Sequence, residues 1–259
     1  MEKPKTPGYA VEVEEATTVS SSTETAVEEK IDIAALMAMG DVTAGEKIFK
    51  KCAEEANIGE VVVATEDQEI LEDVIKNGGR AILTSKNHKT GTDRIYEAFQ
   101  KLEVQDVDLI MNLQGDEPAI DIEDIIRLNK KMVSSQSKMG TLAANIKEPK
   151  DLSNKDIVKV ITKNHLNDDE FSEAETFLRS SSEKNNIYHH IGIYCYSTET
   201  LKKFVELNQS RNEIENRLEQ LRALDNNIKI NVALANSSPI GVDTKEDYLA
   251  LKKIMEYKA

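Results

Sequence analysis

The chain contains no tryptophan and only two cysteines, Cys52 and Cys195. Two cysteines are too few for a disulfide framework, and no site in the chain can use a tryptophan ring as a stacking platform. No apolar run approaches the roughly 20 residues that a bilayer-spanning helix needs, and the first residues show no apolar signal-peptide core. We therefore expect a cytoplasmic protein without a membrane partner.

An excess of positive charge is also lacking. The 259 residues carry 33 Lys and Arg against 47 Asp and Glu, a formal net charge of −14. Such a surface repels a phosphate backbone, which argues against a nucleic-acid partner, although a nucleotide can still bind where basic residues gather locally. With 39% hydrophobic and 31% charged residues, the composition is that of a globular protein with one large or two small domains.

The N-terminal part of the chain differs from the rest. Residues 1–44 are rich in Glu, Ser and Thr, and we expect an acidic extension that is disordered apart from a short helix, either a linker or an inert tail. Residues 41–52 resemble the start of a class I c-type cytochrome, but Ala53 to Ala56 supply neither the second Cys nor the His of a haem attachment site. Covalent haem is thereby excluded, and Cys52 is interpreted as a small apolar residue on a helix.

Residues 45–259 are expected to form one domain of the α/β class, because short apolar runs alternate with helical stretches. We expect a mostly parallel, Rossmann-like sheet with helices on both faces, and a smaller mixed β subregion around residues 157–196. The expected strands span 60–65, 80–84, 108–113, 141–146, 157–162, 175–179, 188–196 and 229–235. The expected helices span 67–75, 92–102, 122–132, 201–207, 213–224 and 245–257. We expect Asp67 to cap the first of them and Asn77-Gly78-Gly79 to close it.

Carboxylates follow two of these apolar runs. Gln114-Gly115-Asp116-Glu117-Pro118 comes directly after the strand expected at 108–113, and Gly241-Val242-Asp243-Thr244 lies near the other end of the chain. Ligands of open α/β sheets bind at the carboxyl ends of strands. Two Asp residues at such ends can share one divalent cation beside phosphates, so Asp116 and Asp243 predict a Mg²⁺ site for nucleotide chemistry.

A third segment, Gly91-Thr92-Asp93-Arg94, opens an expected helix. Gly91 allows a close backbone approach, the helix start offers free N–H groups to a phosphate or base edge, and Arg94 adds a planar cation. Taken alone, a Gly-Thr-Asp segment is more often just a turn with an N-cap.

Taken in order, these segments resemble the 3-deoxy-manno-octulosonate (Kdo) cytidylyltransferase family, also called CMP-Kdo synthetases. The resemblance runs from about residue 51 to the C-terminus. It rests on the segments at 60–67, 91–94, 114–118, His190-Ile191-Gly192-Ile193-Tyr194, Leu218-Glu219-Gln220-Leu221-Arg222 and 241–244. The segments at 190–194 and 218–222 argue against a relative that activates sialic acid.

The resemblance implies a nucleotidyltransferase that moves CMP from CTP to the anomeric 2-hydroxyl of Kdo for lipopolysaccharide biosynthesis, releasing pyrophosphate. It implies a homodimer and Mg²⁺ held by Asp116 and Asp243, which neutralises phosphate charge during in-line attack. It places Gly91, Thr92 and Arg94 around the nucleotide. It places Gln114, Arg179, His190, Tyr194, Glu219 and Gln220 against the sugar acid, with Arg179 suited to the carboxylate.

Several of these residues have plainer interpretations when taken without the family. His190 in an alternating strand is compatible with a hydrogen-bonded core histidine, Tyr194 with an ordinary strand aromatic, and Glu219 with a solvated helix residue. His189 stands where the family commonly has Arg. Because adjacent strand residues point to opposite faces, His189 and His190 are poor candidates for a shared metal site.

The chain departs from the family near its start. Family members begin with a buried strand and a basic, Gly-containing loop that wraps the triphosphate, whereas the first arginine here is Arg80. We expect the sheet to lack a central strand, and the apolar residues 31–40 to be helical rather than a replacement strand. We also expect weakened triphosphate binding. A catalytically inactive relative that keeps sugar-acid binding or dimerisation is the alternative.

Overall fold

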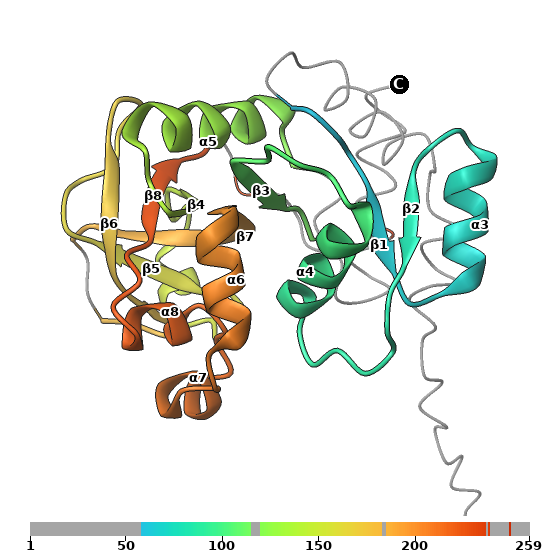
Figure 1. Cartoon of the computed structure of the whole chain (residues 1–259). Coiled ribbons are helices and arrows are strands. Elements are labelled where there is room, and N and C mark those ends of the chain that lie inside the picture. Colours follow the sequence, from blue (N-terminus) through green and yellow to red (C-terminus); the bar gives the residue numbers. More distant parts are fainter. Residues whose placement is uncertain (1–57, 115–119, 183–184, 237, 239–248, 250–259) are drawn as a thin grey trace, which may run out of the picture. The chain divides into compact units, whose positions relative to one another are not determined.

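The computed structural model describes residues 58–114, 120–182, 185–236, 238 and 249 (Figure 1). The extension expected over 1–44, its boundary with the domain and the helix carrying Cys52 fall outside these residues. So do Asp116, Asp243 and, apart from Leu249, the helix expected over 245–257. These expectations therefore remain predictions.

The first described elements form a strand–helix–strand unit. β1 (Val63–Thr65) and β2 (Ala81–Leu83) pair in parallel, and α3 (Gln68–Lys76) connects them. Asp67 caps α3 by accepting a hydrogen bond from the Glu69 N–H at 2.7 Å. Beyond the C-cap, Gly78 adopts a φ of 81°, which only glycine tolerates readily. The capping residue and the closing glycine were both expected from the sequence.

Helix α4 (Gly91–Leu102) follows and contacts β1, β2 and α6. Thr90 is its N-cap and accepts a hydrogen bond from the Asp93 N–H at 3.2 Å. The helix start is therefore fixed by a side-chain cap directly before the Gly-Thr-Asp-Arg segment.

The remaining strands form a six-stranded sheet in the order β3-β7-β4-β8-β6-β5, and β5 also pairs with β7. Five of these strands, β7, β4, β8, β6 and β5, therefore form a closed ring of pairings, and β3 pairs with β7 alone among the described strands. Their bounds are β3 (Leu109–Asn112), β4 (Met139–Ala144), β5 (Lys159–Thr162), β6 (Phe171–Leu178), β7 (Ile187–Ser197) and β8 (Asn231–Leu234).

The long strand β7 organises this sheet because it pairs with three others. Its first residues pair with β5, and its last residues lie between β3 and β4. The register with β4 shifts between Thr141 and Leu142, where Thr141 lies opposite Tyr194 and Leu142 opposite Ile191. Irregularities of this kind redirect side chains and are frequent beside functional sites.

The α/β class is confirmed, but the predominance of parallel pairing is not found among the described strands. Of the seven described pairings, only β1–β2 and β4–β8 are parallel. The reason is β7, which runs antiparallel to each of its three partners, together with β6, which runs antiparallel to β5 and β8. The mixed subregion expected around 157–196 therefore extends over most of the described sheet.

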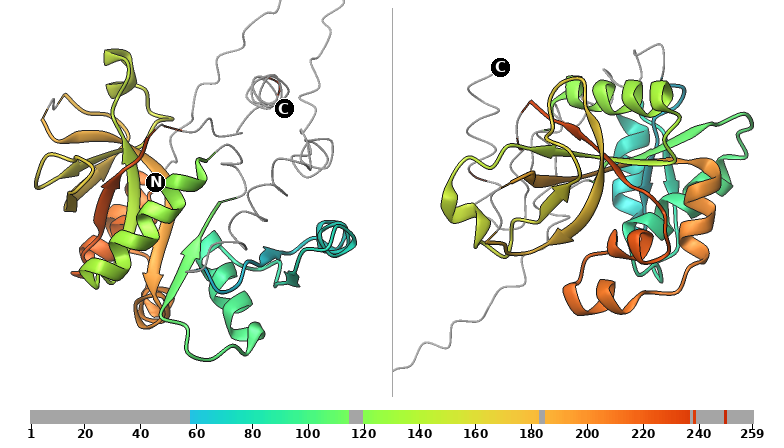
Figure 2. Two further views of the ribbon diagram at one scale, coloured as in Figure 1. Left: turned by 90° about the horizontal axis from the view of Figure 1, so that it is seen from above. Right: turned by 90° about the vertical axis from the view of Figure 1, so that its left-hand side faces the viewer.

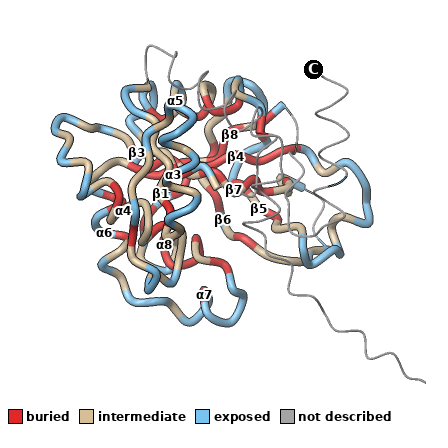
Figure 3. Tube along the Cα trace, turned by 90° about the vertical axis from the view of Figure 1, so that its right-hand side faces the viewer, coloured by how far each residue is buried: buried red, intermediate tan, exposed pale blue. Residues whose placement is uncertain are grey.

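Helices cover both faces of the six-stranded sheet (Figures 1 and 2). α5 (Ile122–Ser135) packs its Ile125, Leu128 and Met132 on one face, in a cluster with Ile191 and Ile193. α6 (Thr198–Glu206) packs on the other face with Tyr196. Between these layers β4 is buried along its whole length (Figure 3). No helix within the described ranges has the length and apolar character needed to cross a bilayer.

The single helix expected over 213–224 is wrong. The structure has two short helices there, α7 (Arg211–Asn216) and α8 (Leu221–Asp225). Arg217 ends α7 in the left-handed region with a φ of 53°, so the backbone leaves the helix axis before Glu219. The sequence has no Gly or Pro at this point, which is why periodicity alone favoured one helix. A short 3₁₀ helix, η1 (Pro149–Leu152), was also not expected.

The described strands fall into two sheets, because β1 pairs only with β2 and β3 only with β7 among them. The expected lack of a central strand stays a prediction, because residues 1–57 lie outside the described part of the chain. Residues 31–40, the segment that we expected not to replace it as a strand, lie outside the described part of the chain.

Candidate active site

The start of α4 brings Gly91 and Thr92 against two other parts of the chain. A Cβ on Gly91 would lie 3.1 Å from Gln114 Nε2, so only glycine leaves ordinary space for the Gln114 amide here. Thr92 is 1% exposed, and its Oγ1 donates a hydrogen bond to Glu219 Oε2 at 2.8 Å. Four of the residues expected to bind nucleotide or sugar thus meet at the first turn of α4.

Glu219 lies in the segment between α7 and α8, where its carboxylate is held without being fully paired. Besides Thr92, Thr90 hydrogen-bonds this side chain. Its Oε1 is enclosed by the protein, has no hydrogen-bond partner among the described residues, and lies 3.6 Å from Arg222 Nη2. Burial raises the pKa of Glu219 above its ordinary value, although the Thr92 and Thr90 hydrogen bonds and the Arg222 charge oppose this. The interpretation of Glu219 as a solvated helix residue is therefore wrong.

Arg222 is a buried support for Glu219 that the sequence did not predict. Its Nε and Nη2 donate to the Glu213 carboxylate at 2.8 and 2.5 Å, and its guanidinium stacks 4.7 Å from the centre of the Phe204 ring. Both side chains of the pair are 4% exposed. The Glu213 hydrogen bond raises the pKa of Arg222, so the cation beside Glu219 is fixed at every physiological pH.

His190 is a neutral, buried imidazole. Its Nε2 lies 3.1 Å from Thr141 Oγ1, and the Thr141 hydroxyl donates to the Ile193 carbonyl at 2.6 Å. Because the single hydroxyl proton of Thr141 is donated to that carbonyl, the hydrogen bond between His190 and Thr141 needs a hydrogen on His190 Nε2, which then donates to Thr141 Oγ1. Burial, with a smaller contribution from His189, lowers the pKa of His190 to about 3. His190 can therefore offer a ligand neutral hydrogen bonding but not a positive charge.

Aromatic rings continue from His190 along β7. The His190 ring packs edge-on to Phe177 at 5.1 Å and lies 5.4 Å from the Tyr194 ring, which in turn lies 6.0 Å from Tyr196. Tyr196 is buried, and a hydrogen bond joins its side chain to Thr92. His189 contacts a different group, Ser238 Oγ, at 2.8 Å, in line with the opposite orientations expected for the two histidines.

Arg94 uses its guanidinium within the protein. Its Nη1 donates to Thr84 Oγ1 at 2.7 Å, and its Nη2 forms an ion pair with Glu66. Thr84 and Glu66 directly follow β2 and β1, so Arg94 ties together the carboxyl ends of these two strands. Its expected contact with the nucleotide remains a prediction, and the ion pair means that a ligand would share an already neutralised cation.

Arg179 also contacts the protein rather than standing free. Its Nε, Nη1 and Nη2 donate to the carbonyls of Asn216, Lys155 and Arg217 at 3.1, 3.2 and 3.1 Å. Two of these carbonyls belong to the turn just before Glu219. The described contacts therefore give Arg179 a role in holding that turn, and its binding of a sugar carboxylate remains a prediction. Gln220, the N-cap residue of α8, is 8% exposed.

The two aspartates expected to bind metal lie outside the described residues. Within the described ranges, no group of three or more His, Cys, Asp or Glu side chains is arranged to hold a metal ion. The chemistry of the expected donors, two carboxylates, suits a hard cation such as Mg²⁺.

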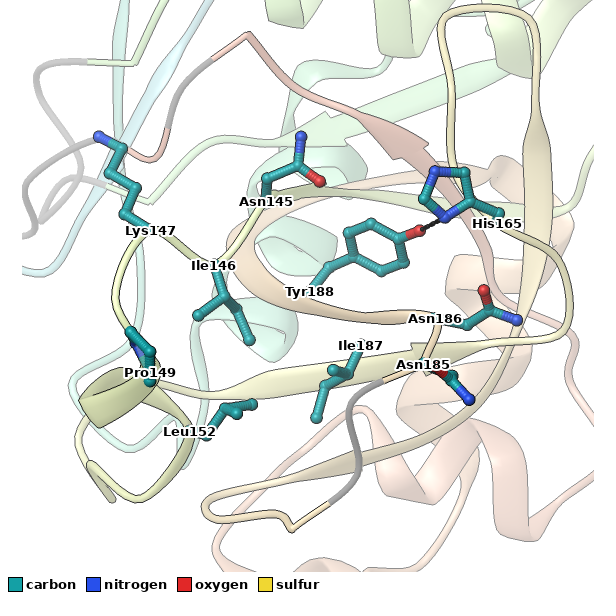
Figure 4. A pocket seen from close by; sticks show the side chains of 10 residues that line it. All are labelled: Asn145, Ile146, Lys147, Pro149, Leu152, His165, Asn185, Asn186, Ile187 and Tyr188. Atoms are coloured by element: carbon teal, nitrogen blue, oxygen red, sulfur yellow. Dashed lines mark hydrogen bonds between the residues drawn. The ribbon is translucent and has the colours of Figure 1, made fainter.

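A hollow in the described part of the structure lies beside η1 and the start of β7 (Figure 4). It has a volume of about 870 Å³ and is lined by residues of η1, of β7 and of the connections beside them. In it, Tyr188 and His165 share a hydrogen bond of 2.9 Å. None of the expected site residues lines this hollow, so its size does not identify it as the site.

Comparison with known proteins decides the family. The sequence profile described as cytidylyltransferase matches residues 37–230. A 3-deoxy-manno-octulosonate cytidylyltransferase from Thermodesulfovibrio yellowstonii is 41% identical over 221 residues, which cover 81% of this chain and 87% of that protein. The chain belongs to the 3-deoxy-manno-octulosonate cytidylyltransferase family. It is therefore an enzyme of the nucleotidyltransferase class by membership.

Further relatives support the same assignment. The 3-deoxy-manno-octulosonate cytidylyltransferase of Bartonella tribocorum is 38% identical over 210 residues, covering 78% of this chain and 84% of that protein. The solved structure of a CMP:2-keto-3-deoxy-manno-octonic acid synthetase complexed with CTP superposes with a TM-score of 0.74 at 30% identity, covering 83% and 88% of the two chains. A 4-diphosphocytidyl-2C-methyl-D-erythritol synthase from Anaerococcus prevotii, at 14% identity and a TM-score of 0.55, shares the fold.

Four residues that contact the expected site residues or support them were not predicted from the sequence: Thr141, Tyr196, Glu213 and Arg222. Arg222 stands in the Leu-Glu-Gln-Leu-Arg segment that carried the family resemblance, so it was in view without a role. Glu213 follows Ser210 with the spacing of a capping box, which the structure confirms. No pattern in the sequence connects Thr141 with His190, because their contact depends on the pairing of β4 with β7.

Proposed function

We propose that this chain transfers CMP from CTP to the anomeric 2-hydroxyl of Kdo, giving CMP-Kdo and pyrophosphate for lipopolysaccharide biosynthesis. The observation that carries the proposal is the hydrogen bond between Thr92, at the helix start expected to meet the nucleotide, and Glu219, in the segment expected to meet the sugar. The cytidylyltransferase profile, which matches residues 37–230, covers both segments. Because CTP is a cytoplasmic nucleotide, we place the reaction in the cytoplasm.

In this reaction the sugar hydroxyl releases its proton to water and its oxygen forms a bond to the α-phosphorus of CTP, while the bond from that phosphorus to the pyrophosphate oxygen breaks. Asp116 and Asp243 would hold the Mg²⁺, which supplies charge neutralisation for the phosphates when bound. The protein's own part is to align the hydroxyl with the phosphorus, since holding two reactants in place removes much of the entropic barrier.

The described residues suit the recognition of a hydroxyl-rich acid. Glu219 Oε1 is an enclosed acceptor that a sugar hydroxyl can satisfy. His190 provides a neutral ring and Tyr194 a phenol within 5.4 Å of each other, measured between ring centres. Arg179 would meet the sugar carboxylate with donors beyond the three that its guanidinium gives to backbone carbonyls.

Triphosphate binding is proposed to be weak in this chain. The basic loop that wraps the triphosphate in the family has no counterpart among residues 1–51, which contain no arginine. Each lost charge-assisted contact costs about 1.5–3 kcal/mol. We also propose a homodimer, as the family resemblance implies.

The test is release of pyrophosphate by the purified chain with CTP, Kdo and Mg²⁺. Release that requires all three components, with a KM for CTP well above that of the Thermodesulfovibrio yellowstonii relative, supports the proposal. Binding of Kdo without any release supports the inactive relative. A KM for CTP equal to that of the relative would refute the proposed weakness of triphosphate binding.

A further inference from the structure

Asn112 is a buried residue whose side-chain amide nitrogen lacks a hydrogen-bond partner in the described part of the chain. It is the last residue of β3 and is 5% exposed. Its amide Nδ2 is enclosed and has no hydrogen-bond partner among the described residues. Nearly all buried polar groups in proteins are paired, because an unpaired one loses its bonds to water without compensation. An exception therefore calls for a role outside the packing of the free protein.

The position of Asn112 places this amide on the site face of the sheet. In the antiparallel register Asn112 lies opposite Tyr194, and directly opposite residues point to the same face. The neighbouring residue Met111 packs instead in the apolar cluster on the other face, with Cys195. Asn112 thus shares a face with the aromatic rings that continue to His190.

Glu219 carries a second buried side-chain atom that lacks a hydrogen bond, and this atom is an acceptor. Glu219 Oε1 is an enclosed acceptor without a hydrogen-bond partner among the described residues. Glu219 accepts a hydrogen bond from Thr92. The residue before Thr92, Gly91, lies beside the side chain of Gln114, since a Cβ on Gly91 would be 3.1 Å from Gln114 Nε2, and Gln114 is two residues after Asn112. Asn112 Nδ2 is therefore a donor, and Glu219 Oε1 an acceptor, that makes no hydrogen bond to any described residue. Sugar hydroxyls can both donate and accept.

We infer that Asn112 is a substrate-binding residue whose amide N–H donates to an oxygen of the bound sugar acid. The inference rests on the proposed function for the identity of that ligand. It adds to the expected sugar contacts a residue that neither the sequence motifs nor the family resemblance had singled out. Its unpaired state in the free protein follows directly, because the partner of Nδ2 arrives with the substrate.

The test uses the full chain and equilibrium binding of Kdo, measured by calorimetry in the presence of Mg²⁺, so that it does not depend on turnover. Asn112→Leu has a similar volume and no amide, and Asn112→Asp replaces the donor with an acceptor. We expect the Kd for Kdo to rise at least tenfold in both variants. We expect the melting temperature of Asn112→Leu to equal or exceed that of the parent, since an unpaired buried amide is removed.

Asn231 supplies the matched control. Its Nδ2 donates to the Phe171 carbonyl at 2.9 Å and its Oδ1 accepts from Ser137 at 2.8 Å, so its amide is paired at both ends. Asn231→Leu should lower the melting temperature and leave the Kd for Kdo of the folded protein within twofold of the parent. Asn112→Leu would overturn the inference if it behaved in the same way.

The outcomes separate this inference from the proposed function. If the parent binds Kdo but releases no pyrophosphate, the proposed transfer fails, and the effect of Asn112 on binding still decides the inference. If the parent does not bind Kdo at all, the inference is overturned. Weakened Kdo binding in Asn112→Asp, with an unchanged melting temperature, supports it even if Asn112→Leu fails to fold.

Discussion

Thr92 Oγ1 donates a hydrogen bond to Glu219 Oε2 at 2.8 Å, across 127 positions of the sequence. This bond connects the N-terminal turn of α4 to the segment between α7 and α8, and both partners are largely removed from solvent. Under the proposed function, this bond aligns the nucleotide-binding part and the sugar-binding part of one site. Removing it should therefore lower the rate of CMP transfer.

Thr92→Val removes the donor while keeping the shape of the side chain. A hydrogen bond to a charged group contributes about 1.5–3 kcal/mol, so kcat/KM for Kdo should fall roughly tenfold to a hundredfold. Thr92→Ser keeps the hydroxyl and should retain most of the activity. Steady-state pyrophosphate release measures both variants, and equal activity of Thr92→Val and the parent would contradict a role for this bond.

The pH dependence of stability should report on Glu219. Burial raises its pKa in the folded protein above the ordinary value of 4.5. The folded state then holds the proton more tightly than the unfolded state, so the contribution of Glu219 is fully present below pH 4.5 and is lost as the pH rises through the folded pKa. Glu219→Gln, which cannot ionise, should show no such loss.

The measurement is the free energy of unfolding of the parent and of Glu219→Gln, determined by urea denaturation from pH 4 upward. The variant should gain stability relative to the parent as the pH rises. Its transfer activity should be lower than that of the parent. A difference in stability that is constant with pH would show that the Glu219 pKa is the same in both states.

The buried pair of Glu213 and Arg222 should contribute strongly to stability when one partner is removed. Although burial opposes ionisation, hydrogen bonds from Arg222, Gln209 and the Ser210 N–H hold the pKa of Glu213 below its ordinary value. Glu213→Ala leaves the Arg222 cation buried without a carboxylate, and such changes cost about 3–5 kcal/mol. Urea denaturation at neutral pH measures this cost.

An exposed pair in the same helix provides the comparison. Arg211 and Glu215 lie 2.6 Å apart, with side chains 88% and 54% exposed. Because exposed ion pairs contribute little, Glu215→Ala should change stability by less than about 1 kcal/mol. Equal losses in Glu213→Ala and Glu215→Ala would mean that the buried pair has no special role.

Glu97 should control the acid limb of the stability curve. A hydrogen bond from Lys101, two from the Ser85 N–H and the contact with His88 lower the pKa of Glu97 from 4.5 to about 2. Since the folded pKa is lowered, the stabilisation is present above pH 4.5 and is lost as the pH falls toward about 2. In Glu97→Gln the melting temperature should fall less steeply as the pH drops below 4.5. An equally steep fall in the variant and the parent would show that other groups cause the loss of stability in acid.

The elements up to α5 were predicted from local signals. The Asp67 cap, the glycine after α3 and the helix start at Gly91 each depend on residues within a few positions of one another. Such features follow from backbone conformation and capping, which the sequence states directly. The close approach of a nucleotide to Gly91 stays a prediction, and the neighbouring side chain that the structure places there, Gln114, could not be derived from spacing.

The support of the candidate site could not be predicted because it depends on long-range pairing and on one unusual turn. Arg222 meets Glu213 only because Arg217 takes a left-handed conformation that its residue type does not suggest. Thr141 meets His190 only through the register shift between β4 and β7. In both cases the partners are set by tertiary structure rather than by local periodicity.

The most direct test of the account is pyrophosphate release by the purified chain with CTP, Kdo and Mg²⁺, compared with Asp116→Asn and Asp243→Asn. The account predicts Kdo-dependent release that falls by at least a hundredfold in either variant, while Kdo binding persists. Release that is unaffected by both substitutions, or the absence of release by the parent at any CTP concentration, would contradict it.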